Sequence, residues 1–159
     1  CIRDRHYNAD GTIQEVPYFK DTRLEQVEAF DPYRRVEAET MAWGYGLKTS
    51  KFSDGKGVYV HSIDDGDSLR LRGVDFGRRG AKRFTACVAS AKGGCSIEIH
   101  LDHAGGPLVG TLQVESTGGQ DSYREMACEV SGAKKTHDLV FVFRGAGKDL
   151  MQWDWWRFE

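Results

Sequence analysis

The stretch LMQWDWWRFE at residues 150–159 decides the fold of this chain. It holds three of the four tryptophans, gathered around one aspartate. Chain ends fray unless they are packed, so bulky aromatic residues at an end favour a terminal strand within a sheet. In such a strand residues 154, 156 and 158 face one side, and residues 153, 155 and 157 face the other. We therefore expect Trp156 and Phe158 in the core, and Trp155 half-covered on the opposite face beside Arg157.

The chain from Arg35 to this stretch is a series of short apolar and polar alternations separated by glycine-rich turns. It contains no segment with the period of a long helix. Eight or nine strands at this spacing are typical of an all-β fold, an antiparallel β-sandwich. Before the terminal strand, the expected strands span residues 36–40, 57–61, 68–72, 83–88, 96–101, 108–114, 123–130 and 138–143.

The overall composition fits one globular domain. The chain has 159 residues, of which 40% are hydrophobic, enough for one sizeable core. Its formal charge of −2 argues against binding to nucleic acid. No apolar run approaches the roughly 20 residues that a membrane helix needs. We therefore expect neither nucleic acid nor a membrane as a partner.

Residues 1–33 differ from the rest and are too few to form a core. Residues 7–13 look like a short hairpin with Asp10 and Gly11 at its turn. We interpret residues 1–33 as a linker or the remnant of a preceding domain, packed on a module that spans residues 34–159. Because the chain begins at Cys1 rather than Met, we expect it to be a piece of a longer protein, from which a signal segment could have been removed.

The four cysteines form no CxxC pair, and their spacing from histidines does not resemble a zinc site. Cys87 and Cys95 flank a turn that contains two glycines, so a disulfide between them is one interpretation. Two buried free thiols that behave as small apolar residues are the favoured alternative.

Sequence motifs of common enzymes are missing. There is no G-x-S-x-G, H-E-x-x-H, Walker A or G-x-G-x-x-G pattern, and no pair of carboxylates is singled out for glycoside hydrolysis. Asp102 lies between His100 and His103, a weak sign of a metal site that a polar loop explains equally well. We therefore do not expect this chain to be an enzyme.

Three carboxylates at the two ends of the expected sandwich suggest a cation site. Glu37 and Glu39 would point the same way from the first strand, and Asp154 lies in the last. First and last strands are often neighbours in sandwiches, and three carboxylates that meet there would repel one another without a cation. Calcium is a hard ion that prefers such oxygen ligands. The alternative is that the three acids are exposed and separate.

Seven short motifs stand out along the chain: VEAET at 36–40, SIDDGD at 62–67, GVDFG at 73–77, SIEI at 96–99, STGG at 116–119, DL at 138–139 and WDWWRF at 153–158. Together, and in this order, they resemble carbohydrate-binding module family 6. The resemblance covers residues 33–159 and is greatest to the modules that follow the catalytic domain in arabinofuranosidases and xylosidases of glycoside hydrolase family 43. Residues 7–13 are similar to the end of such catalytic domains.

This resemblance implies a jelly-roll β-sandwich with a structural calcium ion held by Glu37, Glu39 and Asp154, and by backbone carbonyls near residues 54–57. It implies non-catalytic binding of xylan, arabinoxylan or a related plant cell-wall glycan, which targets an attached glycoside hydrolase to its substrate. The partners would be that polysaccharide and a catalytic domain in the same chain, outside the cell or in the periplasm. The alternative function is a structural domain that braces the catalytic domain without binding sugar.

The residues that would bind sugar depart from the family pattern. The usual loop cleft of the family has two aromatic residues and an asparagine, where this chain has Ser62, Gln120 and Gln152. The family has a second cleft on the concave face of one sheet, so binding at another surface is the alternative. The candidate carbohydrate-binding residues are Trp43, Tyr45, Tyr123, Asp149, Gln152 and Trp153. For Trp43 and Tyr123 a structural role is the competing interpretation.

Overall fold

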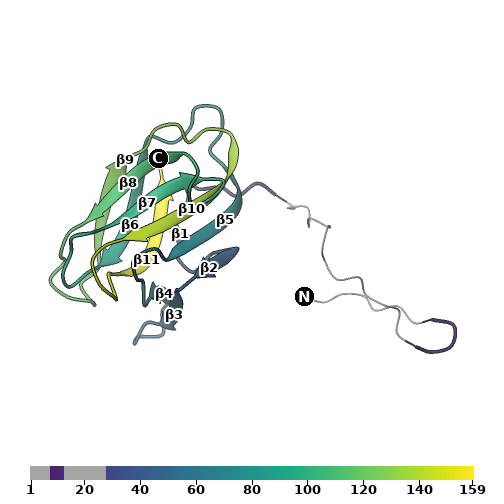
Figure 1. The fold of residues 1–159 in the computed structure, drawn as a ribbon, viewed down its shortest axis with the longest axis horizontal. Coiled ribbons are helices and arrows are strands. Elements are labelled where there is room, and N and C mark those ends of the chain that lie inside the picture. The colour runs from purple at the N-terminus through teal and green to yellow at the C-terminus, as the bar shows by residue number, and fades with distance from the viewer. Residues whose placement is uncertain (1–7, 13–27) are drawn as a thin grey trace.

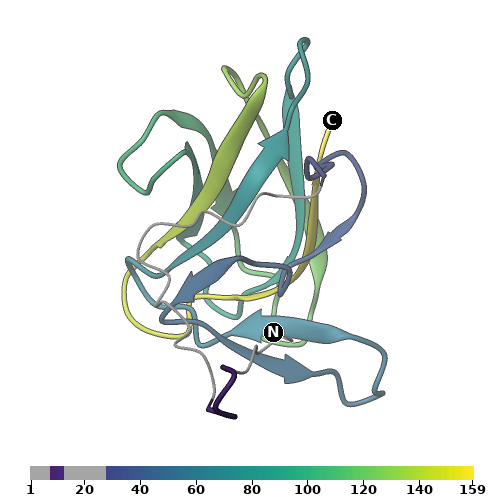
Figure 2. The same ribbon diagram turned by 90° about the vertical axis from the view of Figure 1, so that its right-hand side faces the viewer.

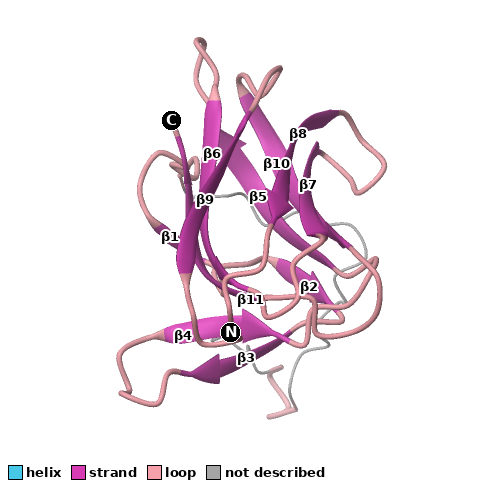
Figure 3. Ribbon diagram, turned by 90° about the vertical axis from the view of Figure 1, so that its left-hand side faces the viewer, coloured by secondary structure: helices cyan, strands magenta, loops and turns pink. Residues whose placement is uncertain are grey.

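The structure is a computed structural model that describes residues 8–12 and 28–159. These residues form two layers of antiparallel β-strands and no helix (Figures 1 and 3). None of the described residues belongs to a helix with the length and apolar character of a membrane span. The strands are β1 (Val36–Glu37), β2 (Trp43–Tyr45), β3 (Lys48–Lys51), β4 (Val58–His61), β5 (Ser68–Asp75), β6 (Arg83–Ala89), β7 (Cys95–Leu101), β8 (Leu108–Val114), β9 (Arg124–Glu129), β10 (Thr136–Arg144) and β11 (Gln152–Phe158).

The strands divide into two sheets that face each other. One sheet has the order β3-β4-β11-β6-β9, with β1 also paired to β11, and the other has the order β2-β5-β10-β7-β8. The terminal strand β11 is therefore interior: β6 pairs along one edge, and β4 and β1 share the other. The all-β antiparallel sandwich expected from the sequence is confirmed. Figures 2 and 3 show that the β3–β4 hairpin runs crosswise to the long strands at one end of the sandwich.

Aromatic side chains from both sheets fill the core. Phe141 of β10 meets Trp153 and Trp156 of β11 with ring centroids 5.0 and 5.3 Å apart, both in edge-to-face geometry. Phe84 of β6 packs on Phe158 at 5.0 Å. Such rings bury large apolar areas, and edge-to-face pairs contribute roughly 0.5–1.5 kcal/mol beyond that burial. The expectation that Trp156 and Phe158 are core residues is confirmed, since they are 0% and 1% exposed.

A bulge in β11 corrects the expected alternation of its side chains. Trp153 pairs with Val88 and Trp155 pairs with Cys87, so Asp154 is an extra residue in the ladder. The bulge turns Trp153 into the core, where it is 0% exposed. Its indole N–H donates to the carbonyl oxygen of Trp155 at 3.1 Å. The side chain of Trp153 is thus a core element and not part of a binding surface.

Trp155 is more deeply covered than its position in the strand predicts. It is 7% exposed rather than half-covered. The guanidinium of Arg35 lies 5.1 Å from its ring centroid, and that of Arg157 lies 5.8 Å away. These cation–π contacts place charged groups over an aromatic face and keep the guanidinium groups partly in water.

The short edge strands are the elements that the sequence did not indicate. The expected strand at 36–40 is only β1, although Ala38 N–H still donates to the carbonyl of Asp154 at 2.8 Å. β2 and β3 were not expected, because their sequences WGY and KTSK lack apolar alternation. The other expected strands are present, with ends shifted by a few residues.

Of the described segments before β1, Phe30 packs against the core, whereas residues 8–12 are exposed. Phe30 forms a parallel bridge with Val74, and its ring lies 6.3 Å from that of Trp156. At the predicted hairpin, Asn8 and Thr12 pair through the backbone around Gly11, so the Asp-Gly turn is present. The outer residues of that hairpin, 7 and 13, lie outside the described residues.

The described cysteines are free thiols. Cys87 and Cys95 are buried and unpaired, which confirms the favoured interpretation and excludes a disulfide between them in this structure. Burial raises the pKa of the Cys87 thiol to about 11. The thiol is therefore protonated near neutral pH and behaves as a small apolar group.

We predict that Trp153→Ala destabilises the fold by roughly 3–5 kcal/mol, since it leaves a large cavity in a close-packed core. Trp43→Ala is the matched control, because Trp43 is 71% exposed. It should change the free energy of unfolding by no more than about 0.5 kcal/mol. Urea unfolding followed by tryptophan fluorescence measures both. Equal losses for the two variants would contradict the assignment of Trp153 to the core.

Candidate functional site

The predicted sugar-binding residues lie in three different environments. Trp43 and Tyr45 lie on β2 at the edge of the five-stranded sheet. Tyr123 and Gln152 line a groove beside the β3–β4 hairpin. Asp149 lies in the loop before β11, and Trp153 is buried in the core.

The first surface, which we call the Trp43 groove, is a depression of about 500 Å³ on the outer face of the five-stranded sheet. Trp43 and Tyr45 pair with Arg70 and Ser68 of β5, so these four side chains share one face. Trp43 is 71% and Tyr45 66% exposed. The groove is lined by Ala42, Trp43, Arg70, Arg72 and Asp138.

The sequence W-G-Y of β2 is what directs two aromatic side chains outward. A Cβ atom on Gly44 would lie 2.7 Å from the sulfur of Met41 and 3.7 Å from Leu47 Cδ1, so the inward position between the aromatics has little room for a side chain. The residues on either side then point to solvent. Because β2 is the edge strand of its sheet among the described residues, Trp43 has a neighbouring strand on one side only.

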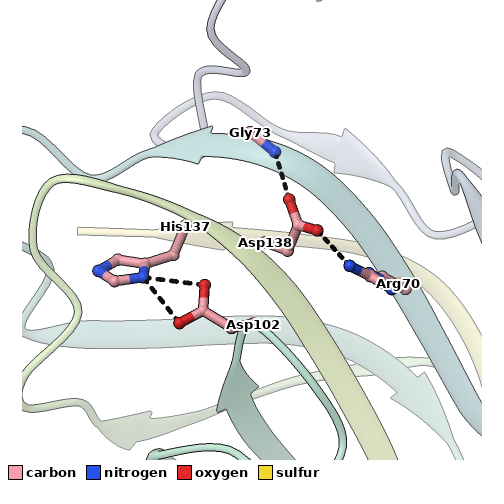
Figure 4. A network of polar contacts seen from close by, with 5 residues as sticks. All are labelled: Arg70, Gly73, Asp102, His137 and Asp138. Carbon is pink, nitrogen blue, oxygen red and sulfur yellow. Dashed lines mark hydrogen bonds and ion pairs between the residues drawn. The ribbon is translucent and has the colours of Figure 1, made fainter. Parts of the chain in front are cut away.

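Asp138 lines the Trp43 groove and contacts Gly73 and Arg70, as Figure 4 shows. Leu139 pairs with Leu71 and His137 with Val74, so Arg72 and Gly73 both lie opposite Asp138 in a bulge. Gly73 has a positive φ of 61°, which suits glycine in such a bulge. Its N–H donates to Asp138 Oδ1 at 3.0 Å, and the guanidinium of Arg70 binds Asp138 Oδ2. Both carboxylate oxygens are thus engaged.

These contacts fix both the charge of Asp138 and the position of Arg70. Burial raises the pKa of the Asp138 carboxyl, but hydrogen bonds from Arg70 and Gly73 and the charge of Arg72 outweigh it, and the net shift is downward. Asp138 is therefore a carboxylate at neutral pH. Arg72 is exposed, and no hydrogen bond or ion pair to it is found within residues 8–12 and 28–159.

Beside this network, Asp102 binds a different histidine from those next to it in sequence. His137 Nδ1 lies 3.0 Å from Asp102 Oδ1, as Figure 4 shows. His100 Nδ1 instead contacts the carbonyl of Gly106 at 3.0 Å. The residues behind the weak sign of a metal site at 100–103 therefore make a hydrogen bond between Asp102 and His137 and a loop contact of His100.

The second surface, which we call the Tyr123 groove, is a depression of about 510 Å³. The rings of Phe52, Tyr59 and Tyr123 pack on one another, with centroids 4.9 Å apart for Phe52–Tyr59 and 5.4 Å for Phe52–Tyr123. The Tyr123 hydroxyl donates to Gln152 Oε1 at 2.7 Å. Burial raises the pKa of Tyr123 above its usual range. The groove is lined by Lys51, Phe52, Ser53, Asp54, Tyr59, Asp121, Tyr123 and Gln152.

Phe52 and Tyr59 are groove residues that the sequence reasoning missed. The alternation of VYVH in β4 was the available signal for Tyr59, since Val60 is fully buried and its neighbours must face outward. Phe52 lies in the turn after β3, where no periodicity indicates its direction.

The residues at the family's usual loop cleft are engaged within the protein. Gln120 Nε2 donates to the carbonyl of Asp149 at 3.2 Å, and Gln152 accepts the hydrogen bond from Tyr123. Ser62 Oγ lies 3.0 Å from His61 Nδ1. Asp149 N–H donates to Asp64 Oδ1 at 2.9 Å. These contacts tie the loops to one another, and none of the three positions presents an aromatic ring.

The three predicted cation ligands lie near the junction of β1 and β11, together with Arg35. Arg35 binds Glu37 with N–O distances of 2.9 and 3.1 Å, and its Nη2 lies 3.6 Å from Asp154 Oδ2. Burial raises the pKa of Asp154, Arg35 opposes that shift, and the charges of Glu37 and Glu39 add to it. Glu39 Oε2 is buried without a hydrogen-bond partner.

The carboxylates are not arranged around a preformed metal position. In the described part of the chain, no group of three or more His, Cys, Asp or Glu side chains is close enough to hold a metal ion. The unpaired oxygen of Glu39 and the raised pKa of Asp154 nevertheless mark a place where negative charge is under-compensated.

Comparison with known proteins identifies the family. Arabinoxylan arabinofuranohydrolases of Bacillus subtilis (strain 168) and Paenibacillus polymyxa are 45% and 40% identical over 157 residues, 96% of this chain. The chain spans 30% and 24% of the length of these relatives. A solved family 6 module from Clostridium cellulolyticum in complex with xylose matches with a TM-score of 0.76 at 39% identity. That match covers 81% of this chain and 98% of the other. The family model described as carbohydrate binding module (family 6) matches residues 37–159, and the chain therefore belongs to this family of non-catalytic carbohydrate-binding modules.

Proposed function

We propose that this module binds xylan or arabinoxylan and holds an attached glycoside hydrolase on that substrate. The names of its relatives support this substrate class, and its share of their length supports an attached catalytic domain. The observation that carries the proposal is the Trp43 groove, where an exposed indole lies beside fixed hydrogen-bonding groups. Binding through such a module raises the local concentration of substrate and performs no chemistry.

The physical basis of binding is that a sugar ring is amphipathic. Its C–H faces stack on aromatic planes, and its hydroxyl groups need polar partners around the edge. Trp43 and Tyr45 offer exposed planes. Arg70 and Asp138 hold each other in place, and the remaining N–H groups of Arg70 and the second lone pairs of the Asp138 oxygens can serve sugar hydroxyl groups. The aromatics of the Tyr123 groove already pack on one another, so we assign the Trp43 groove first.

The second candidate function is a structural domain that braces the catalytic domain without binding sugar. The hydrogen bonds that Gln120 Nε2 and Gln152 Oε1 make within the protein favour this alternative, since each engages one amide atom of a residue at the family's usual loop cleft.

A structural calcium ion is the second part of the proposal. Glu37, Glu39 and Asp154 would hold it, and the unpaired Glu39 Oε2 supports the fit of an oxygen-preferring cation there. An ion at this place would connect the first strand to the last and so stabilise the sandwich.

We also propose residues 1–33 as a linker or domain remnant, residues 34–159 as the module, and a location outside the cell or in the periplasm, where polysaccharide substrates are found.

We predict that Trp43→Ala abolishes retardation in affinity electrophoresis on arabinoxylan, whereas Tyr123→Ala leaves it within roughly twofold of the unchanged chain. Loss of the indole plane removes stacking of the order of 1–2 kcal/mol or more, enough for a tenfold or larger change. The reverse result would assign binding to the Tyr123 groove. No retardation of the unchanged chain on any plant glycan would favour the bracing function.

We predict that calcium raises the melting temperature without changing the affinity for glycan. Saturation at 100 times the dissociation constant would add about 2.7 kcal/mol of stability. A chelator should reverse the effect. An ion that changes affinity but not stability would contradict a structural role.

We predict that Asp154→Asn changes stability in a direction that depends on calcium. Burial raises the pKa of the Asp154 carboxyl in the folded state above its value in the unfolded chain. Without calcium, this shift stabilises the fold fully at a pH below the unfolded-state pKa, and the stabilisation is lost as the pH rises through the folded-state pKa. At pH 7 in chelator the variant should therefore be at least as stable as the unchanged chain, and in calcium it should be less stable. Asp149→Asn is the matched control, and its effect should not depend on calcium. Equal effects of Asp154→Asn in both conditions would remove Asp154 from the site.

A further inference from the structure

We propose that the Trp43 groove prefers xylan-type chains that carry carboxylate groups, such as uronic-acid side units, and that Arg72 is the residue that recognises the carboxylate. This inference rests on the proposed function, because it names the class of glycan that the same groove selects. It comes from the balance of charge on the outer face of the five-stranded sheet.

Two of the arginines on this face each bind a carboxylate. Arg144 of β10 lies 3.0 Å from Glu98 of β7, and Arg70 binds Asp138. In the part of the chain that the structure describes, Arg72 has no such partner. The groove thus contains two guanidinium groups and one carboxylate, which leaves one positive charge for a ligand to neutralise.

Asp138 is not available to neutralise Arg72 fully. Its Oδ1 accepts the N–H of Gly73, and its Oδ2 accepts from Arg70. The bulge puts Arg72 opposite the same carboxylate, where it contributes attraction but no hydrogen bond. The five donors of the Arg72 guanidinium therefore face solvent in a place where the backbone is fixed.

The position of Arg72 also matches the geometry of a sugar bound on Trp43. Trp43 pairs with Arg70, and Arg72 lies two residues further along the same face of β5, about 6.8 Å away along the strand. A backbone sugar stacked on the indole would then place a substituent near the guanidinium.

A guanidinium group distinguishes a carboxylate from a hydroxyl group. It binds a carboxylate through two parallel charge-assisted hydrogen bonds, which are stronger than bonds to neutral oxygens. A neutral arabinose side unit would leave the charge of Arg72 without a counter-ion. The groove therefore gains more from an acidic side unit than from a neutral one.

The test is affinity electrophoresis of the 159-residue chain on three probes: glucuronoxylan, the same glucuronoxylan after reduction of its carboxyl groups, and arabinoxylan. We expect roughly three- to tenfold tighter binding to glucuronoxylan than to its reduced form. Arg72→Gln should remove that difference, so that the variant binds glucuronoxylan and its reduced form equally. The preference should weaken as added salt shortens the screening length below about 8 Å.

Arg79→Gln is the matched control, since it makes the same change in charge at an exposed arginine in the loop between β5 and β6. It should keep the preference. Melting temperatures of both variants equal to that of the unchanged chain would show that folding is not affected. A preference that Arg79→Gln removes as fully as Arg72→Gln would overturn the assignment, because it would reflect net charge.

The outcomes separate this inference from the function on which it rests. Equal binding to glucuronoxylan and its reduced form, abolished in both by Trp43→Ala, would overturn the carboxylate preference and support the Trp43 groove. Absence of binding to all three probes would overturn both.

Discussion

The fold depends on the pairing of its last strand along both edges. β11 lies between β6 on one side and β4 and β1 on the other, and the N–H groups of Lys82 and Arg83 reach the carbonyl of Glu159 at its end. Its three inward side chains, at 153, 156 and 158, supply much of the aromatic core. An interior terminal strand means that neither the six-stranded sheet nor the core is complete without the last residues of the chain. Backbone hydrogen bonds and aromatic packing therefore act on the same ten residues.

The bulge that fits β11 to this position has an electrostatic consequence. It directs Trp153 inward and leaves Asp154 in a partly buried place near Glu37 and Glu39. Burial of a carboxylate is unfavourable unless a cation compensates for it. Arg35 provides one positive charge, shared between Glu37 and Asp154, and Glu39 keeps a buried oxygen without a partner. The local excess of negative charge follows from the backbone geometry that packs the core, and it is the physical basis of the proposed divalent cation at this junction.

Local pattern predicted the long strands well, because residues such as 97, 99 and 101 alternate strictly and one face is buried. It failed where one residue changes the register. Strict alternation places Trp153 and Trp155 on the same face of the strand. Only the pairing with β6 reveals that Asp154 is an extra residue, which puts the two side chains on opposite faces. The edge strands β2 and β3 carry no apolar alternation. The groove contacts join residues far apart in sequence: Arg70 and Asp138 are 68 positions apart, and no short motif contains both.

The two grooves show why exposure of an aromatic residue depends on its place in the sheet as much as on its type. In the Tyr123 groove three rings pack on one another and a hydroxyl group binds Gln152, so little aromatic surface is left for a ligand. In the Trp43 groove the ring belongs to an edge strand, and Gly44 lies over Met41 so that both aromatic neighbours point outward. The adjacent strand then contributes charged side chains at positions that a bulge and Asp138 hold in place. A flat apolar plane next to fixed polar groups is the arrangement that an amphipathic ligand such as a sugar requires.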